Sequence, residues 1–555
     1  MKQRIGLLVD NLEVSKQLHD FIELSLSSDS YEVTTLILNN PKIPNKNFLS
    51  SIFRYLHKRG LLKFVNKIYF LLISKLEQQI LKKKSSYKDF YSSFNLSSRH
   101  LEIIEVEPTL SDSGLFVSYK DSDLDKIKEA RLNLLVRGGR GILKGGILTI
   151  CPNGIISFHH ADNDVNRGGP SGFWEVYKKS PTTGFIIQRL NENLDGGDVL
   201  FKGFIQTDWL YSRNKINLYE TSTSFLHKTI ENIICESSIT ESYPKIPYSE
   251  TLYTIPNVLE STNYLFKTLF IFFSKKANRF FGIRNRWNVA YQFTNNWQGA
   301  ELRKSIKILN PKNHFLADPF ILKRDNKHYC FVEDYDYAEE KGSIAVYEIN
   351  REGHIELGKA LEEDFHLAYP FLFEYENELY MCPETNEINE IRLYKCVEFP
   401  LKWTFEKVLM ENISAVDTCI FCYKEKWWLI SNIDYSTAGQ NSSQLHIFHA
   451  STPLSDEWIP HVHNPVIFDP SKARNGGFIQ NQSKYYRVYQ RQAFNIYGGS
   501  FGVAQITELD EENYLEESLF EVEPHFFPKI TRTHTFNYSD GLLVLDYAKE
   551  ENKNS

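Results

Sequence analysis

Short apolar runs spaced by about one helix length dominate the start of the chain. They lie at Arg4–Asp10, Glu32–Leu38, Leu132–Leu143 and Ile155–His159. Runs that are nearly continuous in Leu, Ile and Val are typical of parallel strands buried on both faces. Because strands that alternate with helical segments form βαβ units, the pattern predicts an α/β, Rossmann-like domain over residues 1–205.

Residues 45–100 interrupt this rhythm with a basic helical insertion. Between Phe48 and Lys84, nine Lys or Arg residues accompany a single acidic residue, Glu77, and apolar residues recur at roughly helical spacing. Two interpretations stay open. The segment either forms a helical hairpin packed on its own domain, which we favour, or makes peripheral contact with an anionic membrane, at the inner membrane face.

Residues 206–295 are predicted to be a helical connector. Within them Leu265–Phe273 is strongly apolar but is interrupted by Lys267. This apolar core is too short to cross a bilayer of about 30 Å. We therefore expect a helix that docks between domains.

From Trp297 onward the pattern changes to short aromatic strands and turns, and it repeats. Five units begin at Ala317, Ala368, Ala415, Ala473 and Thr533, and each has an apolar or aromatic residue twelve positions later. Units of two or more strands that recur at about 50-residue intervals are typical of propeller blades. The repeat predicts an all-β, five-bladed propeller over residues 296–550.

Composition narrows the function. The chain has 555 residues, 42% hydrophobic residues and a net charge of −7, which describes a soluble, multidomain protein and disfavours nucleic acid as a partner. Seven scattered cysteines indicate a reducing compartment, and Cys419 and Cys422 would point to opposite faces of a strand, so no metal site is expected. Met1–Arg4 leads directly into the first apolar run, so we expect no signal peptide and a cytoplasmic protein.

The candidate chemistry of the first domain centres on His159 and Asp195. A histidine at the end of a buried strand and a carboxylate in a glycine-rich turn could together accept and orient a proton. Further elements follow at Arg167-Gly168, Thr183-Gly184 and Leu194-Asp195-Gly196-Gly197-Asp198. In this order they resemble the folate-dependent formyltransferase family, whose pattern runs Asn-x-His, Arg-Gly, Thr-Gly and Leu-Asp-x-Gly-Asp. Ser157 stands where that family has Asn.

The resemblance implies 10-formyltetrahydrofolate as co-substrate and an amine as acceptor. His159 would take the proton from the amine, Asp195 would orient His159, and Ser157, with His160, would contact the formyl oxygen. Arg167 would steady its loop or hold an anionic group of the substrate. The residues that the resemblance assigns to the folate site are Gly138, Gly139, Gly141 and Asp198. The alternative is an inactive domain that keeps these residues as relics.

Asp318, Glu384 and Asp417 are the candidate residues of the propeller. They lie in first strands or at strand ends of successive units, where a propeller faces its central channel, so they could converge. Three interpretations remain. The carboxylates could bind sugar hydroxyls while three aromatic residues, Tyr335, Tyr369 and Trp428, stack on sugar rings. They could instead tie neighbouring blades together, or form an acid–base pair for glycoside hydrolysis.

The motifs of this half resemble those of known propellers. They are His314–Phe320, Tyr369–Phe371, Pro383–Thr385, Ser414–Thr418 and Tyr497–Gly499. They are similar to the five-bladed glycosidases and, more closely, to the N-terminal propeller of plant glucosamine inositolphosphorylceramide transferases.

Together the two halves predict a formyltransferase that modifies an amino sugar, carried on a nucleotide or a glycan, while the propeller recognises carbohydrate. The alternative is a propeller glycosidase, or a non-catalytic polysaccharide-binding protein with a degenerate transferase domain.

Overall fold

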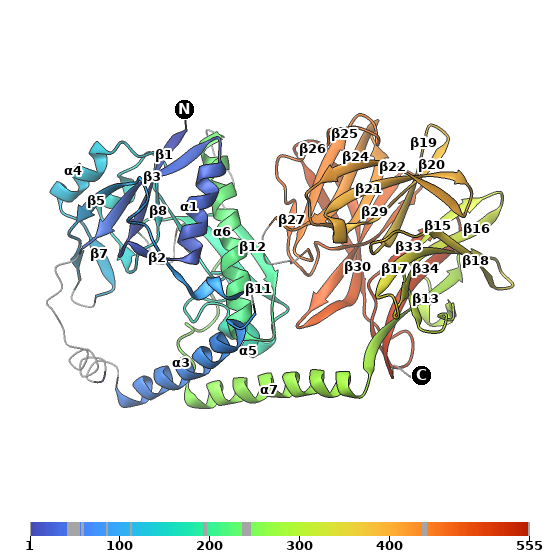
Figure 1. Ribbon diagram of the computed structural model, residues 1–555, viewed down its shortest axis with the longest axis horizontal. Coiled ribbons are helices and arrows are strands. Elements are labelled where there is room, and N and C mark those ends of the chain that lie inside the picture. Colours follow the sequence, from blue (N-terminus) through green and yellow to red (C-terminus); the bar gives the residue numbers. More distant parts are fainter. Residues whose placement is uncertain are drawn as a thin grey trace. The chain divides into compact units, whose positions relative to one another are not determined.

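The computed structural model describes residues 2–40, 56, 60–84, 87–111, 114–192, 197–235, 243, 246–435 and 441–552. The chain divides into two compact units, and the boundary in sequence follows Ile271 (Figure 1).

A seven-stranded sheet forms the centre of the first unit. Its order is β12-β11-β10-β8-β1-β3-β5. Strands β5, β3, β1, β8 and β10 are parallel, whereas β11 and β12 run antiparallel at one edge. The bounds are β1 (Gln3–Val9), β3 (Tyr31–Asn39), β5 (Glu102–Val106), β8 (Leu134–Arg137), β10 (Ile155–His159), β11 (Thr182–Arg189) and β12 (Asp198–Gln206).

Helices cover both faces of this sheet. The buried residues Leu124 and Ile127 of α4 pack with Leu8, Leu135 and Ile155 of the central strands. On the other face lie α1 and α6, which contact each other (Figure 1). The helices are α1 (Lys16–Ser27), α3 (Leu61–Leu81), α4 (Asp121–Glu129), α5 (Phe173–Lys178), α6 (Tyr211–Cys235) and α7 (Val258–Phe280).

Short strands complete the first unit. They form a pair of β2 (Glu13–Ser15) with β4 (Ser93–Asn95), and a small sheet of β6 (Thr109–Leu110), β7 (Phe116–Ser118) and β9 (Ile142–Leu143). The predicted α/β domain is confirmed, because the four apolar runs of the sequence form β1, β3, β8 and β10.

The second unit consists, in its described residues, of five antiparallel sheets. Four are consecutive in sequence: β15–β18, β19–β22, β23–β27 and β28–β31. The fifth joins β13 (Ile283–Phe293) to β34 (Leu542–Asn552), with β14 (Ile306–Lys307), β32 (Ile530–Arg532) and β33 (Phe536–Ser539). Because β13 pairs along its whole length with β34, the two ends of this unit share one sheet, which closes the ring of blades.

The strands of the four consecutive sheets are β15 (His314–Arg324), β16 (Lys327–Asp336), β17 (Lys341–Ile349), β18 (His354–Leu361), β19 (Ala368–Tyr375), β20 (Glu378–Glu384), β21 (Glu390–Glu398), β22 (Lys402–Glu411), β23 (Ala415–Tyr423), β24 (Lys426–Ile433), β25 (Gln444–Ala450), β26 (Ile459–Pro460), β27 (Ile467–Phe468), β28 (Asn475–Asn481), β29 (Lys484–Ala493), β30 (Ile496–Leu509) and β31 (Tyr514–Val522). The predicted repeat starts fall in or just before β15, β19, β23, β28 and β33, which confirms the expected five-bladed propeller.

The stretch 206–295 holds more than a helical connector. Helix α6 packs on β11 and β12 of the first sheet, and β13 is part of the closing blade. Among the described residues, no helix combines the length and the apolar character needed to cross a membrane.

Candidate functional sites

The first candidate site lies at the carboxyl end of β10, the last parallel strand of the sheet. Ser157 and His159 are two residues apart in this strand, so their side chains share one face. Across the ladder they pair with Gln188 and Ile186 of the antiparallel strand β11. Carboxyl ends of parallel strands are where open α/β sheets bind ligands. The fold therefore places His159 where a reacting group is expected.

Ser157 does not have the geometry that the resemblance implies. Its side chain is buried, with 2% exposed, and its hydroxyl donates a hydrogen bond to the carbonyl oxygen of Phe158 at 3.1 Å. In this rotamer the hydroxyl is engaged by the chain itself. The contact of Ser157 with the formyl oxygen stays a prediction, and it would require the hydroxyl to leave this bond.

His160 faces the other side of the sheet. Its ring stacks on Tyr219 of α6 at 3.7 Å between centroids, and its Nε2 lies 2.9 Å from Nε2 of Gln17 and 3.1 Å from Oγ of Ser222. Burial lowers the pKa of His160 to about 3, so the ring is neutral at physiological pH. The expected contact of His160 with the formyl oxygen is wrong, because this side chain, directly after β10, packs among Gln17 of α1 and Tyr219 and Ser222 of α6.

The loop that follows His159 is held by residues that sequence reasoning missed. Lys202 of β12 forms ion pairs with Asp162 and Asp164, both at 2.8 Å. Gly184 of the Thr-Gly motif lies so close to this loop that an added Cβ would stand 2.7 Å from Cβ of Asp162. The glycine is needed for close packing at this point. An Asp-x-Asp sequence after the histidine and a lysine on the edge strand were the available signals.

Arg167 steadies its own loop. Its Nε donates to the carbonyl oxygen of Asn163 at 2.8 Å, and its guanidinium stacks on the ring of Tyr248 at 4.5 Å. The neighbouring Gly168 forms a β-bridge with Tyr253, where a Cβ would stand 2.1 Å from the carbonyl oxygen of Tyr253. Of the two roles considered for Arg167, these contacts match the first.

Two other predicted site residues are Asp195 and Asp198. Asp195 lies outside the described residues. Asp198 begins β12, opposite Arg189, and is exposed. Their assignments to catalysis and to the folate site stay predictions.

The glycine-rich loop after β8 borders a cavity of about 650 Å³ at the carboxyl ends of the central strands. Gly138 and Gly141 line it, together with Asp10 and Asn39. Asp10 accepts hydrogen bonds from Asn39 Nδ2 at 3.0 Å and from the backbone N–H of Arg140 at 2.8 Å.

A Cβ at any of the three loop glycines would meet the protein itself. Added to Gly138 it would stand 2.7 Å from Leu18 Cδ1, added to Gly139 2.7 Å from Asp10 Oδ1, and added to Gly141 2.4 Å from Val117 Cγ2. The glycines therefore allow close packing at the cavity wall, and the polar Asp10–Asn39 pair forms a part of the wall that a bound group could hydrogen-bond.

The second candidate site lies in the propeller, where the three predicted carboxylates converge. Asp318 and Asp417 both sit in β-bulges of their first strands, with φ of 47° and 52°. Non-glycine residues in this left-handed region cost free energy and tend to mark functional sites. The guanidinium of Arg474 lies 2.6 Å from Asp417 Oδ2 and 3.9 Å from Glu384 Oε2, so it bridges two of the acids.

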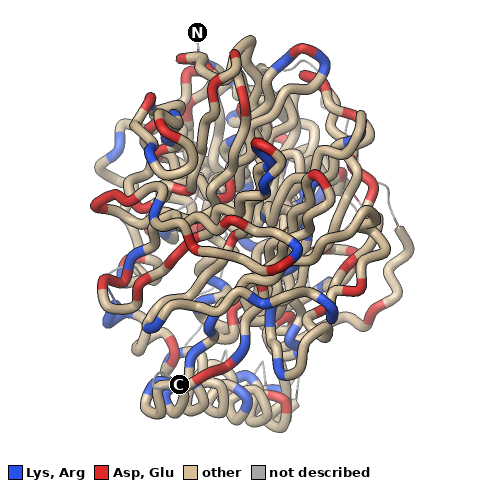
Figure 2. The backbone as a smooth tube through the Cα atoms, turned by 90° about the vertical axis from the view of Figure 1, so that its right-hand side faces the viewer, with Lys and Arg blue, Asp and Glu red and all other residues tan. Residues whose placement is uncertain are grey.

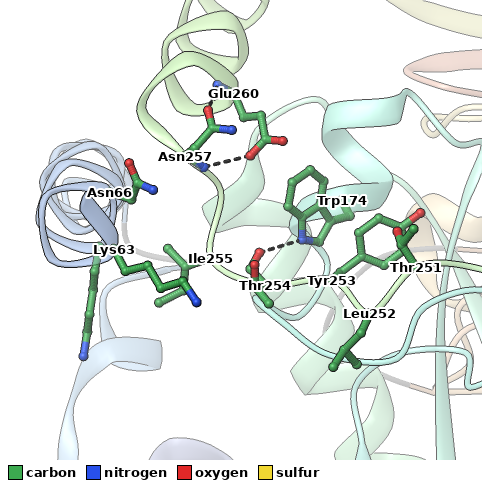
Figure 3. A pocket seen from close by; sticks show the side chains of 11 residues that line it. Lys63, Asn66, Trp174, Thr251, Leu252, Tyr253, Thr254, Ile255, Asn257 and Glu260 are labelled. Atoms are coloured by element: carbon green, nitrogen blue, oxygen red, sulfur yellow. Dashed lines mark hydrogen bonds between the residues drawn. The ribbon is translucent and has the colours of Figure 1, made fainter. Parts of the chain in front are cut away.

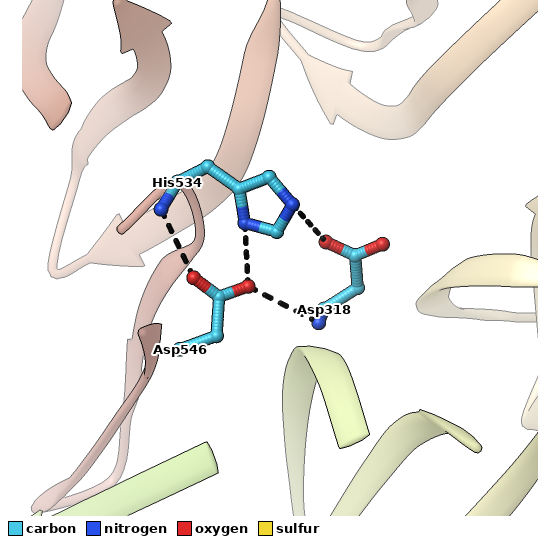
Figure 4. A group of neighbouring side chains, drawn as sticks. All are labelled: Asp318, His534 and Asp546. Carbon is cyan, nitrogen blue, oxygen red and sulfur yellow. Dashed lines mark hydrogen bonds and ion pairs between the residues drawn. The ribbon is translucent and has the colours of Figure 1, made fainter. Parts of the chain in front are cut away.

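Asp318 belongs to a buried triad with His534 and Asp546 (Figure 4). Asp546 accepts from the backbone N–H groups of His534 and Thr535 at 3.0 Å, and its Oδ2 lies 2.6 Å from His534 Nδ1. His534 Nε2 lies 3.8 Å from Asp318 Oδ1, which also accepts from the Thr535 hydroxyl at 2.7 Å. The imidazole stacks on Trp287 at 3.9 Å.

The charges of this triad are strongly coupled. Burial, together with the nearby Asp417 and Asp546, raises the pKa of Asp318 to about 6, against the opposing effect of His534. Burial alone would lower the pKa of His534, but Asp546 and Asp318 raise it above its ordinary value. The ligand atoms of the triad lie within 4.8 Å of one another, a spacing in which a metal ion could bind. In this structure the imidazole lies between the two carboxyl groups, with Nδ1 towards Asp546 and Nε2 towards Asp318.

Glu333 is a further acid that sequence reasoning missed. It stands opposite Ala317 on β16, the position that Glu384 occupies opposite Ala368 on β20. Burial and the surrounding acids Asp318 and Glu384 raise the pKa of Glu333 well above its ordinary value. Burial and Asp417 do the same for Glu384. Aligning the second strands of the blades, and not only the first, was the signal that could have found Glu333.

The aromatic residues proposed to stack on sugars are mostly buried. Tyr369 is fully buried, with its hydroxyl 3.4 Å from Cys419 Sγ, and Trp428 is 2% exposed. Only Tyr335 is partly exposed, and it stacks on Phe315 at 4.7 Å between centroids. Stacking by Tyr369 and Trp428 is therefore wrong, because both rings belong to the packed interior of the blades.

The two domains and their sites define a two-part protein, an α/β domain joined to a five-bladed propeller. Residues 300–529 match the family model described as "Glucosamine inositolphosphorylceramide transferase 1, N-terminal". The Arabidopsis thaliana protein glucosamine inositolphosphorylceramide transferase 1 is 38% identical over 210 residues, which is 37% of this chain and 27% of that protein. The chain thus matches about a quarter of the length of this relative. The expected resemblance of the propeller is confirmed.

Solved structures resemble each half. The propeller resembles the catalytic domain of a GH62 α-L-arabinofuranosidase from Coprinopsis cinerea. The two sequences are 11% identical, the match covers 47% of this chain and 96% of that chain, and the TM-score is 0.32. A second solved structure with a similar fold is a phosphoribosylglycinamide formyltransferase from Bacillus halodurans. The two sequences are 12% identical, the match covers 43% of this chain and 98% of that chain, and the TM-score is 0.28.

Proposed function

We propose that the α/β domain transfers a formyl group from 10-formyltetrahydrofolate to the amine of an amino sugar, carried on a nucleotide or a glycan, and that the propeller recognises carbohydrate. The observation that supports transfer is the position of His159 at the carboxyl end of β10, with the Thr-Gly strand β11 beside it and the loop after it fixed by Lys202. The Asp10–Asn39 wall of the neighbouring cavity offers polar groups for the donor.

His159 would act as the base. In the transfer, the bond from the formyl carbon to the donor nitrogen breaks, a bond from the same carbon to the sugar amine forms, and one proton leaves the amine. His159 accepts that proton and returns it to the donor nitrogen. By its motif, Asp195 would hold the imidazole in the required orientation.

The replacement of the family Asn by Ser157 has a kinetic consequence. A missing hydrogen-bond donor to a developing oxyanion typically lowers the rate by about a hundredfold or more. The engaged hydroxyl of Ser157 supplies no such donor in this rotamer. We therefore expect slow turnover relative to enzymes that keep the Asn.

The test combines donor binding with turnover. Calorimetry with a stable 10-formyltetrahydrofolate analogue should show binding to the wild-type protein, and a panel of amino sugars should show formyl transfer by mass spectrometry. His159→Ala should lower turnover by at least about a hundredfold and leave donor binding in place. The matched control is His100→Ala, an exposed histidine of the same domain. Absence of donor binding, or full activity of His159→Ala, would refute the proposal.

A second activity is favoured by the coupled acids of the propeller. Two carboxyls with raised pKa, the buried Asp318 and the half-buried Glu384, stand near Asp417, which is paired with Arg474. A carboxyl that is protonated can donate a hydrogen bond to a sugar hydroxyl, and an ionised one accepts such bonds; an acid and a base of this kind could also act on a glycosidic bond. We propose saccharide recognition as the role of these acids.

Glycan arrays and reducing-sugar assays on the double variant Asp318→Asn, Glu384→Gln distinguish these roles. Loss of binding with no hydrolysis by the wild type supports recognition. Wild-type hydrolysis that disappears in the variant assigns a glycosidase instead. Unchanged glycan binding would show that these acids do not take part in glycan recognition.

A further inference from the structure

Helix α3 docks on the first unit by one face only. Glu77, 7% exposed, accepts hydrogen bonds from the backbone N–H of Ser212 at 3.0 Å and from the hydroxyl of Tyr264. Phe70 packs edge-on against Phe173 at 5.0 Å between centroids. This confirms that the basic insertion packs on its own domain in its described part.

The opposite face of α3 presents an apolar row. Its members recur at intervals of three or four residues, so they share one side of the helix. Each is between 42% and 68% exposed: Leu61, Val65, Ile68, Leu72, Leu76 and Ile80. A helix that is apolar on two opposite faces needs a second environment for the face that its domain does not cover.

The first half of α7 repeats this arrangement. Ser261, Tyr264 and Thr268 are buried, whereas Leu259, Phe266 and Phe270 are 80%, 68% and 74% exposed. The row continues along the same helix with Phe273 and Phe280, at 61% and 85%. Large aromatic side chains at such exposure, repeated along one helix face, mark an interaction surface.

The two helices lie side by side. The hydroxyl of Tyr69 is 3.1 Å from that of Thr262, and Asn66 Oδ1 accepts from the backbone N–H of Val258 at 3.2 Å. Figure 1 shows α3 and the start of α7 at the lower edge of the first unit. We call the exposed row of α3, together with Leu259, Phe266 and Phe270, the α3–α7 face.

The two helices carry an excess of positive charge. Residues 61–84 and 258–280 contain ten Lys or Arg and two acidic residues, Glu77 and Glu260. Both acids are engaged, Glu77 as described and Glu260 by accepting from the backbone N–H of Asn257 at 2.7 Å. Figure 2 colours Lys and Arg blue and Asp and Glu red along the backbone.

A cavity of about 600 Å³ lies between the start of α3 and its own domain. Lys63, Asn66 and Lys67 of α3 line one side of it, opposite Trp174 and the segment 251–257 (Figure 3). Two ammonium groups and an amide at the rim of a cavity suit an anionic, hydrogen-bonding headgroup.

We propose that the α3–α7 face binds the interface of an anionic lipid bilayer. The Leu, Ile and Phe side chains enter the boundary between headgroups and acyl chains, while the lysines contact anionic headgroups. A protein partner could also cover an apolar row. The excess of ten basic over two acidic residues favours an anionic surface, because each Lys or Arg near such a surface adds attraction.

Vesicle flotation tests this proposal with the full-length protein. Vesicles of phosphatidylcholine alone and mixed with phosphatidylglycerol are compared at low and high salt. We expect binding to the anionic vesicles that weakens with salt, since exposed charges are screened. The double variant Phe266→Glu, Phe270→Glu should lower the partition coefficient at least about tenfold, because two apolar rings no longer leave water.

Two controls make the result specific. Leu309→Glu changes a propeller residue that is 83% exposed, and it should leave vesicle binding unchanged. Lys63→Gln with Lys67→Gln should weaken binding to anionic vesicles only. Unaltered thermal unfolding shows that each variant is folded.

Three outcomes would overturn the proposal. One is wild-type protein that does not float with anionic vesicles. A second is an equal loss of binding in Leu309→Glu. The third is a dimer in sedimentation that the Phe266→Glu, Phe270→Glu variant dissociates without any effect of vesicles, which would assign the face to a second copy of this chain.

Discussion

Replacing Asp318 by Asn should stabilise the propeller at neutral pH. The carboxyl has 6% of its surface exposed, and its pKa is raised from the ordinary 3.8 to about 6. A pKa that is higher in the folded state means that folding favours the protonated carboxyl. This stabilisation is complete below pH 3.8 and is lost as the pH rises through about 6.

The magnitude follows from these two values. Each tenfold change in an equilibrium constant corresponds to about 1.4 kcal/mol, so an ionised Asp318 costs the folded state about 3 kcal/mol above pH 7. Asn resembles the protonated acid, can still accept from the Thr535 hydroxyl, and tolerates the φ of 47°. The variant should therefore gain about 3 kcal/mol at pH 7.5, and almost all of the gain should vanish near pH 4.

Thermal and denaturant unfolding of the wild type and Asp318→Asn at both pH values measure this difference. For a unit of this size about 3 kcal/mol corresponds to a rise in Tm of about 6–12 °C. If the propeller is a saccharide site, the same variant should lose glycan binding, since functional residues are often kept at the expense of stability. A variant that is less stable than the wild type at pH 7.5 would refute the reasoning.

Three further substitutions test contacts within each unit, by thermal unfolding or by proteolysis. Arg487→Met should destabilise the propeller by about 3–5 kcal/mol, because it leaves the carboxylate of Glu516 without its partner. In the wild type this carboxylate lies 2.6 Å from the fully buried guanidinium. Adding Glu516→Leu should recover part of the lost stability. Gly184→Ala should cost about 1–3 kcal/mol, since its Cβ would overlap the loop after β10. Glu77→Leu should release α3 to proteolysis, because two donors lose their acceptor.

Each of these has its own check. Gly353→Ala, where an added Cβ meets nothing within 4 Å, is the matched control for Gly184→Ala. Arg487→Met with unchanged stability would show that the buried pair contributes nothing. Proteolysis of α3 at the wild-type rate in Glu77→Leu would show that other contacts hold the helix.

The strands of both units were predictable because their signal is local. Runs such as Arg4–Asp10 carry their own evidence of burial, and the five repeat starts mark the first strands of the blades. The position of His159 at the end of a strand followed for the same reason. In each case a few neighbouring residues determine the periodicity.

Contacts between distant segments were not predictable in this way. Asp318 and Asp546 are 228 residues apart and meet only because β13 and β34 close the ring of blades. The burial of Tyr369 and Trp428 depends equally on neighbouring blades. The partners of His160 are Gln17 and Tyr219, which come from α1 and α6.

The amino-acid sequence by itself thus determined the order of domains, the location of the strands, the basic insertion and the candidate His159. Only the tertiary structure decided that the hydroxyl of Ser157 hydrogen-bonds to the backbone and that four acids gather around Arg474 and His534. It also decided that α3 has a covered and an uncovered apolar face. The physical reason is that periodicity is encoded within a few residues, whereas burial and charge coupling depend on which segments the closed fold brings together.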